Sequence, residues 1–190
     1  SLVARIMIDK YGAHFINTDK VAKEQMEIGG ISYQGVVDYF GKGILSEDGS
    51  INSKKLSQIV FKDKEKLQKL NDLTHPQELG AVVDELKSLR ELEKENYAII
   101  ETALMIEAGF DYICDQVWYV YSPENVRKDR LMKERNYSEE KINSILESQS
   151  RDEDFRRHFS IVIENTGSKE ELEIQIDNIL DKIPKIVDTQ

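Results

Sequence analysis

Several residue types are scarce in this chain, and each shortage excludes a class of structure or site. Cys114 is the only cysteine, so no disulfide can form within the chain and no cysteine-based zinc site can be built. No apolar run approaches the length of about 20 residues that crosses a bilayer, and we expect no membrane role. The sequence as given also has no serine-nucleophile elbow and no complete glycine-rich phosphate loop.

Basic residues are also scarce relative to acidic ones. The chain has 26 Lys and Arg against 36 Asp and Glu, which gives a formal net charge of -10. Binding that trades counterions for Lys and Arg requires net basic surface. The composition therefore argues against nucleic acid as a partner, although a local basic pocket for a small anion stays open.

The remaining composition is that of one soluble globular unit. The chain has 190 residues, 39% of them hydrophobic and 33% charged, which is enough to bury a core. We expect a single domain over residues 1–190. With one cysteine and no signal segment, the expected compartment is the cytoplasm.

Four short apolar runs predict strands. The first passes through Phe15 and Ile16, and the others lie in "NYAIIE", "QVWYVY" and "FSIVIEN". Each is too short and too continuously apolar for an amphipathic helix, and helical patterns separate them. The sequence therefore predicts an α/β fold with a parallel sheet that helices cover on both faces.

The predicted helices are of two kinds. Residues 20–90 are helical in pattern, with breaks at Gly29–Gly30, Gly41–Gly49 and His75–Pro76, and indicate a helical insertion between the first two strands. Further helices begin at Ser122 as a cap before Pro123, within "SEEKINSILESQS", and after a capping box formed by Ser168 and Glu171.

Polar side chains follow each predicted strand, where α/β sheets bind ligands. Asn17, Thr18 and Asp19 follow the first strand, Glu101 the second, Ser122 the third, and Glu164 with Asn165 the fourth. Two carboxylates at one sheet edge suit a magnesium site together with a general base. The alternative is that Asp19 and Glu101 are helix caps or solvated loop residues.

Basic side chains concentrate in residues 122–157. Arginine forks of this kind build phosphate clamps, and the alternative is a solvated face of ion pairs. The basic residues are Arg127, Lys128, Arg130, Lys133, Arg135, Arg151, Arg156 and Arg157.

His75, next to Pro76 in an expected polar loop, is either a ligand-binding residue or a structural one.

Several strings taken together resemble the dephospho-coenzyme A kinase family. "FINTDKVAK" resembles its Asp-x-Asp tip followed by Val-Ala-Lys, and "FGKGILSEDGSINSKKLSQIVFKDKEKLQKLNDLTHP" is similar to its helical stretch. "IIETALMIEAGF", "RLMKERNYSEEKINSILESQS" and "FSIVIENTGSKEEL" are similar to its second-strand, lid and adenine-side segments. The resemblance runs from Ser1 to about Ile183.

The resemblance implies a three-layer P-loop NTPase fold of the nucleoside and nucleotide kinase type. That fold has a parallel core sheet, a helical coenzyme-A-binding insertion over residues 20–90 and a lid over residues 122–157. The implied reaction moves the γ-phosphoryl group of ATP onto the ribose 3'-hydroxyl of dephospho-coenzyme A, with Mg²⁺. The implied partners are these two small molecules, and the implied state is a monomer or a weak homo-oligomer.

The resemblance also implies roles for individual residues. Asp19 and Arg130 would be catalytic, and Ser1 and Glu101 would hold Mg²⁺, Glu101 through water. ATP and its phosphates would be bound by Ser1, Arg130, Arg156 and Asn165, with Gln149 as a further lid candidate. The acceptor would be bound by Asp19, Lys23, His75 and Glu101.

The chain departs from the family pattern at several positions. Ser53 and Leu79 replace arginines, Phe155 replaces a lid lysine, and Asn17 replaces the first acid of the Asp-x-Asp tip. One extra residue precedes Arg130, so Arg127 is an alternative equivalent. A nucleoside or nucleotide kinase with another acceptor, and an inactive relative that binds coenzyme A, are therefore the competing interpretations.

The first residues of the chain also fit the resemblance. Ser1 lies where the family has the last residue of its P-loop, and residues 2–11 where it has the helix that receives phosphate. We therefore expect about a dozen further residues, one strand and one loop, before Ser1.

Overall fold

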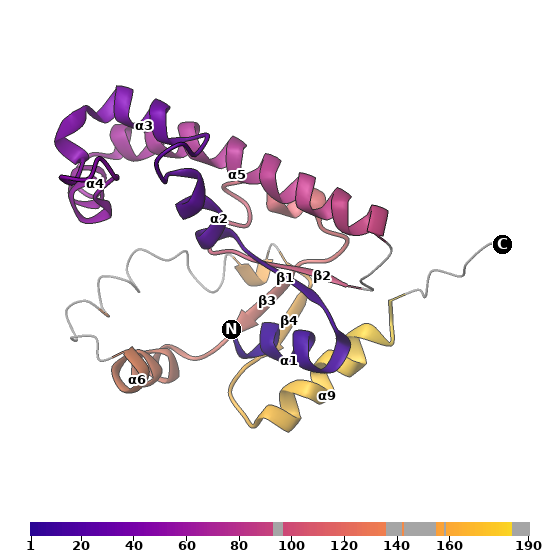
Figure 1. Cartoon of the computed structure of the whole chain (residues 1–190). Helices are drawn as coiled ribbons and strands as arrows, with labels where there is room; N and C mark the ends of the chain where they lie inside the picture. The colour runs from indigo at the N-terminus through magenta and orange to yellow at the C-terminus, as the bar shows by residue number, and fades with distance from the viewer. Residues whose placement is uncertain (93–96, 136–141, 143–154, 158, 184–190) are drawn as a thin grey trace. The chain divides into compact units, whose positions relative to one another are not determined.

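The computed structural model describes residues 1–92, 97–135, 142, 155–157 and 159–183. The chain forms two compact units, the first made of Ser1 with Val3–Cys114 and the second of Leu2 with Asp115–Gln190. Figure 1 labels their elements. Among the described residues, no helix combines the length and apolar character that a membrane span needs.

The first unit contains two strands and most of the helices. In chain order its elements are α1 (Leu2–Tyr11), β1 (His14–Asn17), α2 (Thr18–Gln25), α3 (Tyr33–Phe40), the 3₁₀ helix η1 (Lys42–Ile44), α4 (Ser53–Val60), α5 (Lys64–Leu92), β2 (Ala98–Glu101) and the 3₁₀ helix η2 (Phe110–Ile113).

Helix α1 begins and ends at residues suited to those positions. The Ser1 hydroxyl accepts a hydrogen bond from the Ala4 amide at 3.2 Å, which satisfies one of the free amides of the first turn. Gly12 ends the helix with φ 64°, a left-handed conformation that glycine adopts without a steric penalty. The chain then enters β1 after a single residue, Ala13.

Strands β1 and β2 pair in parallel, with His14 opposite Ala98 and Asn17 opposite Glu101. In the buried cluster beside them, Ile16 from β1 and Val82 from α5 join Ala108 and Phe110. A second cluster, of Val36, Ile44 and Leu56, joins α3 and α4 around η1. One apolar cluster thus packs α5 against β1, and the other packs α3 and α4 together.

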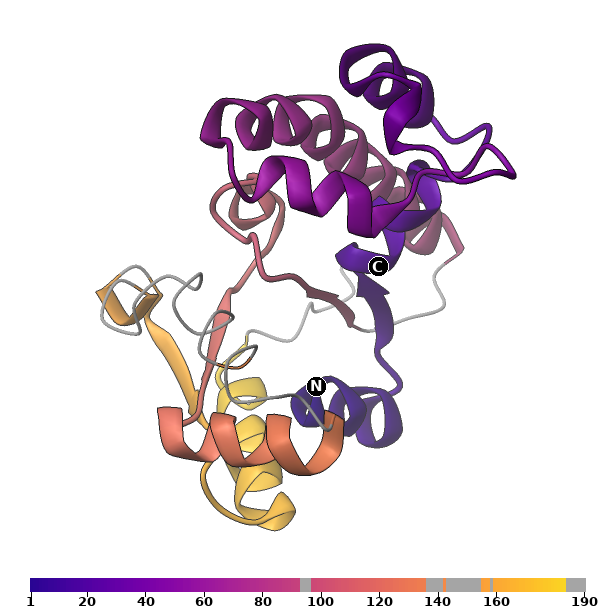
Figure 2. The ribbon, with the colours of Figure 1, turned by 90° about the vertical axis from the view of Figure 1, so that its left-hand side faces the viewer.

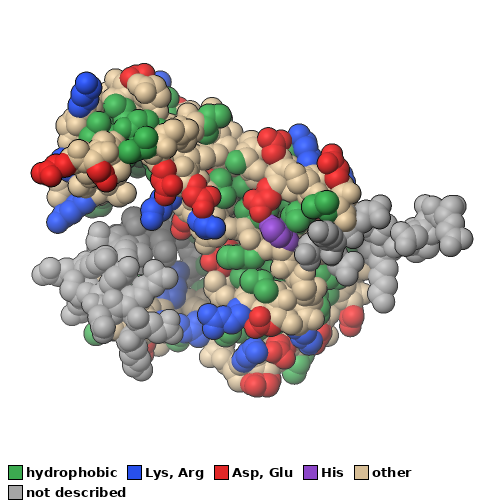
Figure 3. Space-filling model, in the orientation of Figure 1, with side chains coloured by type: hydrophobic (Ala, Val, Ile, Leu, Met, Phe, Trp, Pro, Cys, Tyr) green, Lys and Arg blue, Asp and Glu red, His purple; other side chains and the backbone are tan. Residues whose placement is uncertain are grey.

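The segment between β1 and β2 is helical, as the sequence predicts. Helices α2 and α4 both pack on α5, and Figure 2 shows α4 beside α5. The Gln25 side chain fixes α2 by donating to the Gln77 carbonyl at 2.9 Å. On the face that Figure 3 presents, acidic and basic side chains are intermixed over these helices.

The predicted break at His75–Pro76 is wrong, because α5 continues through it from Lys64 to Leu92. Proline inside a helix removes one hydrogen bond and costs about 3 kcal/mol. Packing of a stripe at Thr74, Glu78 and Val82, which are buried at four-residue spacing, offsets that cost. His75 is therefore a helix residue and not a loop residue.

The second unit contains β3 (Trp118–Tyr121), α6 (Glu124–Arg135), β4 (Ile161–Glu164) and α9 (Lys169–Leu180). Strands β3 and β4 pair in parallel, with Tyr121 opposite Glu164. Helix α9 packs on β4, and the Gln175 side chain holds it there through both backbone groups of Glu164, at 2.9 and 3.0 Å. The predicted capping box of Ser168 and Glu171 is present.

The four predicted strands are confirmed, and each pair is parallel. The described strands form two two-stranded sheets, β1–β2 and β3–β4, whereas the sequence predicts one core sheet. The single domain, the substrate-binding insertion over residues 20–90 and the lid over residues 122–157 stay predictions. The helix expected in "SEEKINSILESQS" lies outside the described residues except for Ile142, which is buried.

Candidate active site

The carboxyl ends of β1 and β2 bring two predicted site regions together. Asn17 and Glu101 are partners at the last position of the strand pair. The Asn17 side chain caps α2 by accepting from the Lys20 amide at 2.9 Å. Asp19, in the first turn of α2, therefore follows directly from the strand end that pairs with Glu101.

Ser1 meets the same strand end. Its α-amino nitrogen lies 2.8 and 3.2 Å from the two carboxylate oxygens of Glu101. This contact brings the Ser1 backbone and the Glu101 carboxyl group together at the end of the strand pair.

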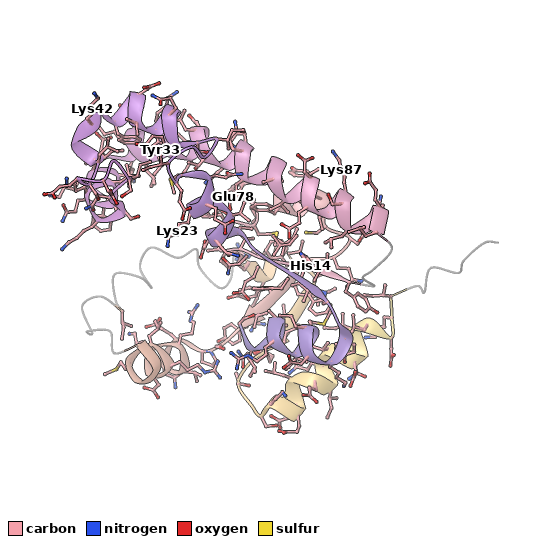
Figure 4. The ribbon with its side chains drawn as sticks, in the orientation of Figure 1. His14, Lys23, Tyr33, Lys42, Glu78 and Lys87 are labelled. Atoms are coloured by element: carbon pink, nitrogen blue, oxygen red, sulfur yellow. The ribbon has the colours of Figure 1, made fainter. Side chains whose placement is uncertain are left out.

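Asp19 and Lys23 lie four residues apart on α2 and are both exposed. Residues at this spacing share one face of a helix. Figure 4 shows Lys23 projecting from α2 away from α5. The structure therefore places a carboxylate and an ammonium group on one accessible face, starting at the end of β1.

His75 lines a hollow of about 330 Å³ between α5 and the segment after β2. Burial lowers the pKa of the His75 imidazole, and a hydrogen bond with the Glu107 backbone and the charges of Glu107 and Asp72 oppose this only in part. A neutral imidazole can both donate and accept hydrogen bonds. The hollow thus has a polar wall suited to an uncharged part of a ligand.

In the second unit, Arg130 joins the two loops that follow β3 and β4. The Ser122 hydroxyl donates to the Asn165 carbonyl at 2.9 Å. The Arg130 guanidinium donates to the Ser122 hydroxyl at 3.3 Å and to the Asn165 carbonyl at 3.2 Å. Its contact with the Asn165 side-chain oxygen is 3.4 Å long. The predicted site residues Arg130 and Asn165 are therefore neighbours.

These contacts correct the predicted role of Ser122. The hydroxyl bonds Asn165 and Arg130 instead of capping a helix, and α6 begins at Glu124, two residues later. Ser122 and Asn165 are both buried, and buried polar groups need hydrogen-bond partners. The Ser122 hydroxyl provides one for the Asn165 carbonyl.

Arg156 is held at the end of the β3–β4 pair. Its guanidinium donates to a Glu164 carboxylate oxygen at 2.8 Å and stacks over the Tyr121 ring at 4.2 Å from the centroid. Phe155 stacks on Tyr119 at 5.1 Å between centroids. Two aromatic rings and one carboxylate therefore fix this short segment. Gln149 and Arg151 lie outside the described residues.

The donor set at the β1–β2 end fits Mg²⁺. Within the described ranges, no three His, Cys, Asp or Glu side chains cluster to hold a metal. Mg²⁺ does not need such a cage, because it binds through one or two protein oxygens together with waters and substrate phosphates. Glu101 offers a carboxylate, and the Ser1 hydroxyl accepts one backbone hydrogen bond and keeps a second lone pair.

Comparison with known proteins decides the family. A dephospho-CoA kinase family model matches residues 1–171. The chain belongs to the dephospho-CoA kinase family. The dephospho-CoA kinase of Carboxydothermus hydrogenoformans is 35% identical over 182 residues, which are 96% of this chain and 87% of that protein. That of Aquifex aeolicus is 35% identical over 180 residues, 94% and 89% of the two chains.

Solved structures agree on the fold. The dephospho-CoA kinase from Campylobacter jejuni matches with a TM-score of 0.66 at 23% identity, over 96% of this chain and 90% of that one. TT1252 from Thermus thermophilus matches with a TM-score of 0.77 at 22% identity, over 96% and 91%. Family membership supports dephospho-CoA kinase activity (EC 2.7.1.24) for this chain and implies the use of ATP.

The positions predicted to depart from the family pattern have defined places in the structure. Ser53 is the first residue of α4. Leu79 packs against the buried cluster of Ile16 and Phe110. Phe155 lies in the aromatic stack on Tyr119. The Leu79 and Phe155 side chains therefore contribute to packing.

The sequence prediction missed Glu78. Glu78 is buried in α5, and burial raises the pKa of its carboxyl, with the charge of Asp19 raising it further. A carboxylate on a stripe with Thr74 and Val82 was the available signal, because core-facing positions rarely hold an acid. The false helix break at Pro76 hid that stripe.

Proposed function

We propose that Asp19 is the general base of a dephospho-CoA kinase that phosphorylates the ribose 3'-hydroxyl of dephospho-CoA. The observation that carries this proposal is the pairing of Asn17 with Glu101, since it places the start of α2 beside the Glu101 carboxylate. Transfer forms the bond between the 3'-oxygen and the γ-phosphorus and breaks the bond to the β,γ-bridging oxygen. The hydroxyl proton passes to the Asp19 carboxylate.

Glu101 and Ser1 would hold Mg²⁺ in this proposal. The oxygen donors of the two side chains, a carboxylate and a hydroxyl, support the assignment. When bound, Mg²⁺ neutralises charge on the β- and γ-phosphates. The first turn of α1 adds its free amides and the positive end of the helix dipole, which attract phosphate.

Arg130, Arg156 and Asn165 would bind the nucleotide. Arg130 presents a planar guanidinium of the kind that binds phosphoryl oxygens in pairs and stabilises charge on the transferring group. Its neighbour Asn165 offers an amide for the adenine. Because the Arg156 guanidinium is already paired with Glu164, we assign Arg156 a weaker role than Arg130 in attracting phosphate.

Lys23 and His75 would bind the acceptor. Lys23 shares a helix face with Asp19 and can attract an acceptor phosphate, and His75 lines a hollow that polar and apolar side chains share.

We place the reaction in the cytoplasm, with the enzyme as a monomer or weak homo-oligomer. A single cysteine suits a reducing compartment.

An acceptor panel tests the proposal. ADP release is measured with ATP, Mg²⁺ and one acceptor at a time: dephospho-CoA, adenosine, cytidine or a nucleoside monophosphate. We expect the highest kcat/KM with dephospho-CoA. Preference for a nucleoside would favour a related kinase, and binding of ligands without ADP release from any acceptor would favour an inactive relative.

A further inference from the structure

Tyr121 and Glu164 form a cradle for Arg156 at the end of the β3–β4 pair. The two cradle residues are partners in the strand register. The Arg156 guanidinium lies 4.2 Å from the centroid of the Tyr121 ring and donates to a Glu164 carboxylate oxygen at 2.8 Å. One cradle residue thus contacts the face of the guanidinium and the other its edge, and together they set its position and its plane.

The cradle is itself held by the sheet and by α9. Glu164 belongs to β4, and the Gln175 side chain of α9 bonds both of its backbone groups. The Tyr121 carbonyl accepts from the Asn165 amide at 2.8 Å. An arginine that docks on the cradle is therefore held against regular secondary structure.

The residue before Arg156 docks beside the cradle. Phe155 stacks on Tyr119 at 5.1 Å between ring centroids. Tyr119 lies two positions before Tyr121 on β3, and residues at this spacing share one face of a strand. Phe155 also stacks on the buried Phe159 at 6.2 Å. The backbone of Arg156 is thus positioned by Phe155, and its side chain by the cradle.

Stability alone explains the contacts of Arg156 poorly. The side chains of Arg156 and Glu164 are 40% and 45% exposed, and exposed ion pairs contribute little to folding. Ordering a long side chain before its ligand arrives, in contrast, removes an entropy cost from binding. The cradle is therefore better suited to a role in binding.

The cradle leaves Arg156 able to bind an anion. The bond to Glu164 uses one of the five N–H groups of the guanidinium, and the aromatic ring contacts only its face. Within the described residues, other N–H groups of the guanidinium stay available to phosphoryl oxygens. Arg130 lies at the same end of the strand pair, where it contacts Ser122 and Asn165.

We propose that Tyr121 and Glu164 are positioning residues for Arg156, which they hold ready to bind the phosphates of ATP. The proposal rests on the proposed ATP-binding role of Arg156. Neither cradle residue touches ATP. Both act through the guanidinium, so their loss should weaken ATP binding and leave kcat nearly unchanged.

Tyr121→Leu and Tyr121→Phe test the contact with the face of the guanidinium. We expect Tyr121→Leu to raise the Kd for ATP about 2- to 10-fold, the cost of ordering one long side chain on binding. Tyr121→Phe keeps the ring and should keep the native Kd. Calorimetric titration with ATP measures the Kd, and steady-state rates measure kcat. A loss of melting temperature with native Kd in Tyr121→Leu would overturn the proposal.

Glu164→Leu and Glu164→Gln test the contact with the edge, and they decide the question if Tyr121→Leu fails to fold. Glu164→Leu should raise the Kd for ATP by a similar factor. Glu164→Gln should keep the native Kd, because its amide oxygen still accepts from Arg156. Tighter ATP binding in Glu164→Leu would show that Glu164 competes with phosphate for Arg156, and the proposal would be wrong.

Glu173→Leu is the matched control. Glu173 of α9 forms a partly exposed ion pair with Lys169 at 3.4 Å. The variant therefore removes a carboxylate and an ion pair of the second unit but leaves the cradle unchanged. We expect the native Kd for ATP. A rise equal to that in Glu164→Leu would contradict the proposal, because it would be an effect of charge alone.

Arg156→Met separates this proposal from the one on which it rests. In the Arg156→Met background, Tyr121→Leu and Glu164→Leu should raise the Kd for ATP no further, because they act through the same guanidinium. A raised Kd in Arg156→Met beside native Kd in both cradle variants would overturn the positioning role alone. Native Kd in Arg156→Met would overturn the ATP-binding role of Arg156, and the positioning role with it.

Discussion

Asn17 and Glu101 are partners at the last position of the β1–β2 pair. This one pairing brings together two segments that lie more than eighty residues apart in the sequence. It places the cap of α2, and Asp19 after it, at the edge where Glu101 contacts Ser1. The chemistry proposed for the chain depends on that edge, and the first prediction tests it.

Asp19→Asn should lower kcat at least about 100-fold, the low end for loss of a general base. The KM for ATP should stay nearly unchanged, because the acceptor loses its base and ATP keeps its contacts. Steady-state rates over both substrates measure this. Glu24→Gln is the control, since it removes an exposed charge of α2 that pairs with Lys20. Comparable kcat in the two variants would contradict the assignment.

Arg130→Met should lower kcat about 100- to 1,000-fold, as loss of a group that stabilises transition-state charge does. Arg130→Lys should recover part of the rate, because it keeps the charge but not the planar fork. Lys128→Met on the same helix removes only an exposed pair with Glu124 and should keep nearly native kcat. If all three variants have equal rates, Arg130 acts only in holding Ser122 and Asn165.

The sequence predicted the elements whose signals are local. All four strands were found because each is a short apolar run that ends in polar residues, and the capping box of Ser168 and Glu171 was found because both members lie within one turn. Asp19 and Glu101 were found because residues after parallel strands meet at one sheet edge. Their roles stay predictions until they are tested by substitution.

Features that depend on tertiary packing were not predictable in this way. The His75–Pro76 pair reads as a helix break, yet burial along one stripe of α5 outweighs the local cost. The Ser122 hydroxyl reads as a cap, yet it bonds a carbonyl 43 positions away. The burial of Glu78 was missed because the stripe that it shares with Thr74 and Val82 crosses the predicted break.

Ile176→Ala should destabilise the second unit by about 2–5 kcal/mol, the range for truncating a buried isoleucine. Ile176 is fully buried in α9, whereas Ile174 of the same helix is 59% exposed. Ile174→Ala makes the same chemical change on the solvent side and should change stability by less than about 0.5 kcal/mol. Urea unfolding of both variants measures the difference, and equal losses would show that α9 does not pack on β4 as described.

His75 should make stability depend on pH below neutrality. Burial holds its pKa in the folded chain below the ordinary value of 6.5, so the unfolded chain binds the proton more readily. Stability from this group is therefore complete above pH 6.5 and falls as the pH drops below it. The native melting temperature should fall more steeply between about pH 7.5 and pH 5.5 than that of His75→Gln, which cannot protonate. Parallel curves for the two proteins would mean that His75 accepts a proton equally well in the folded and unfolded chains.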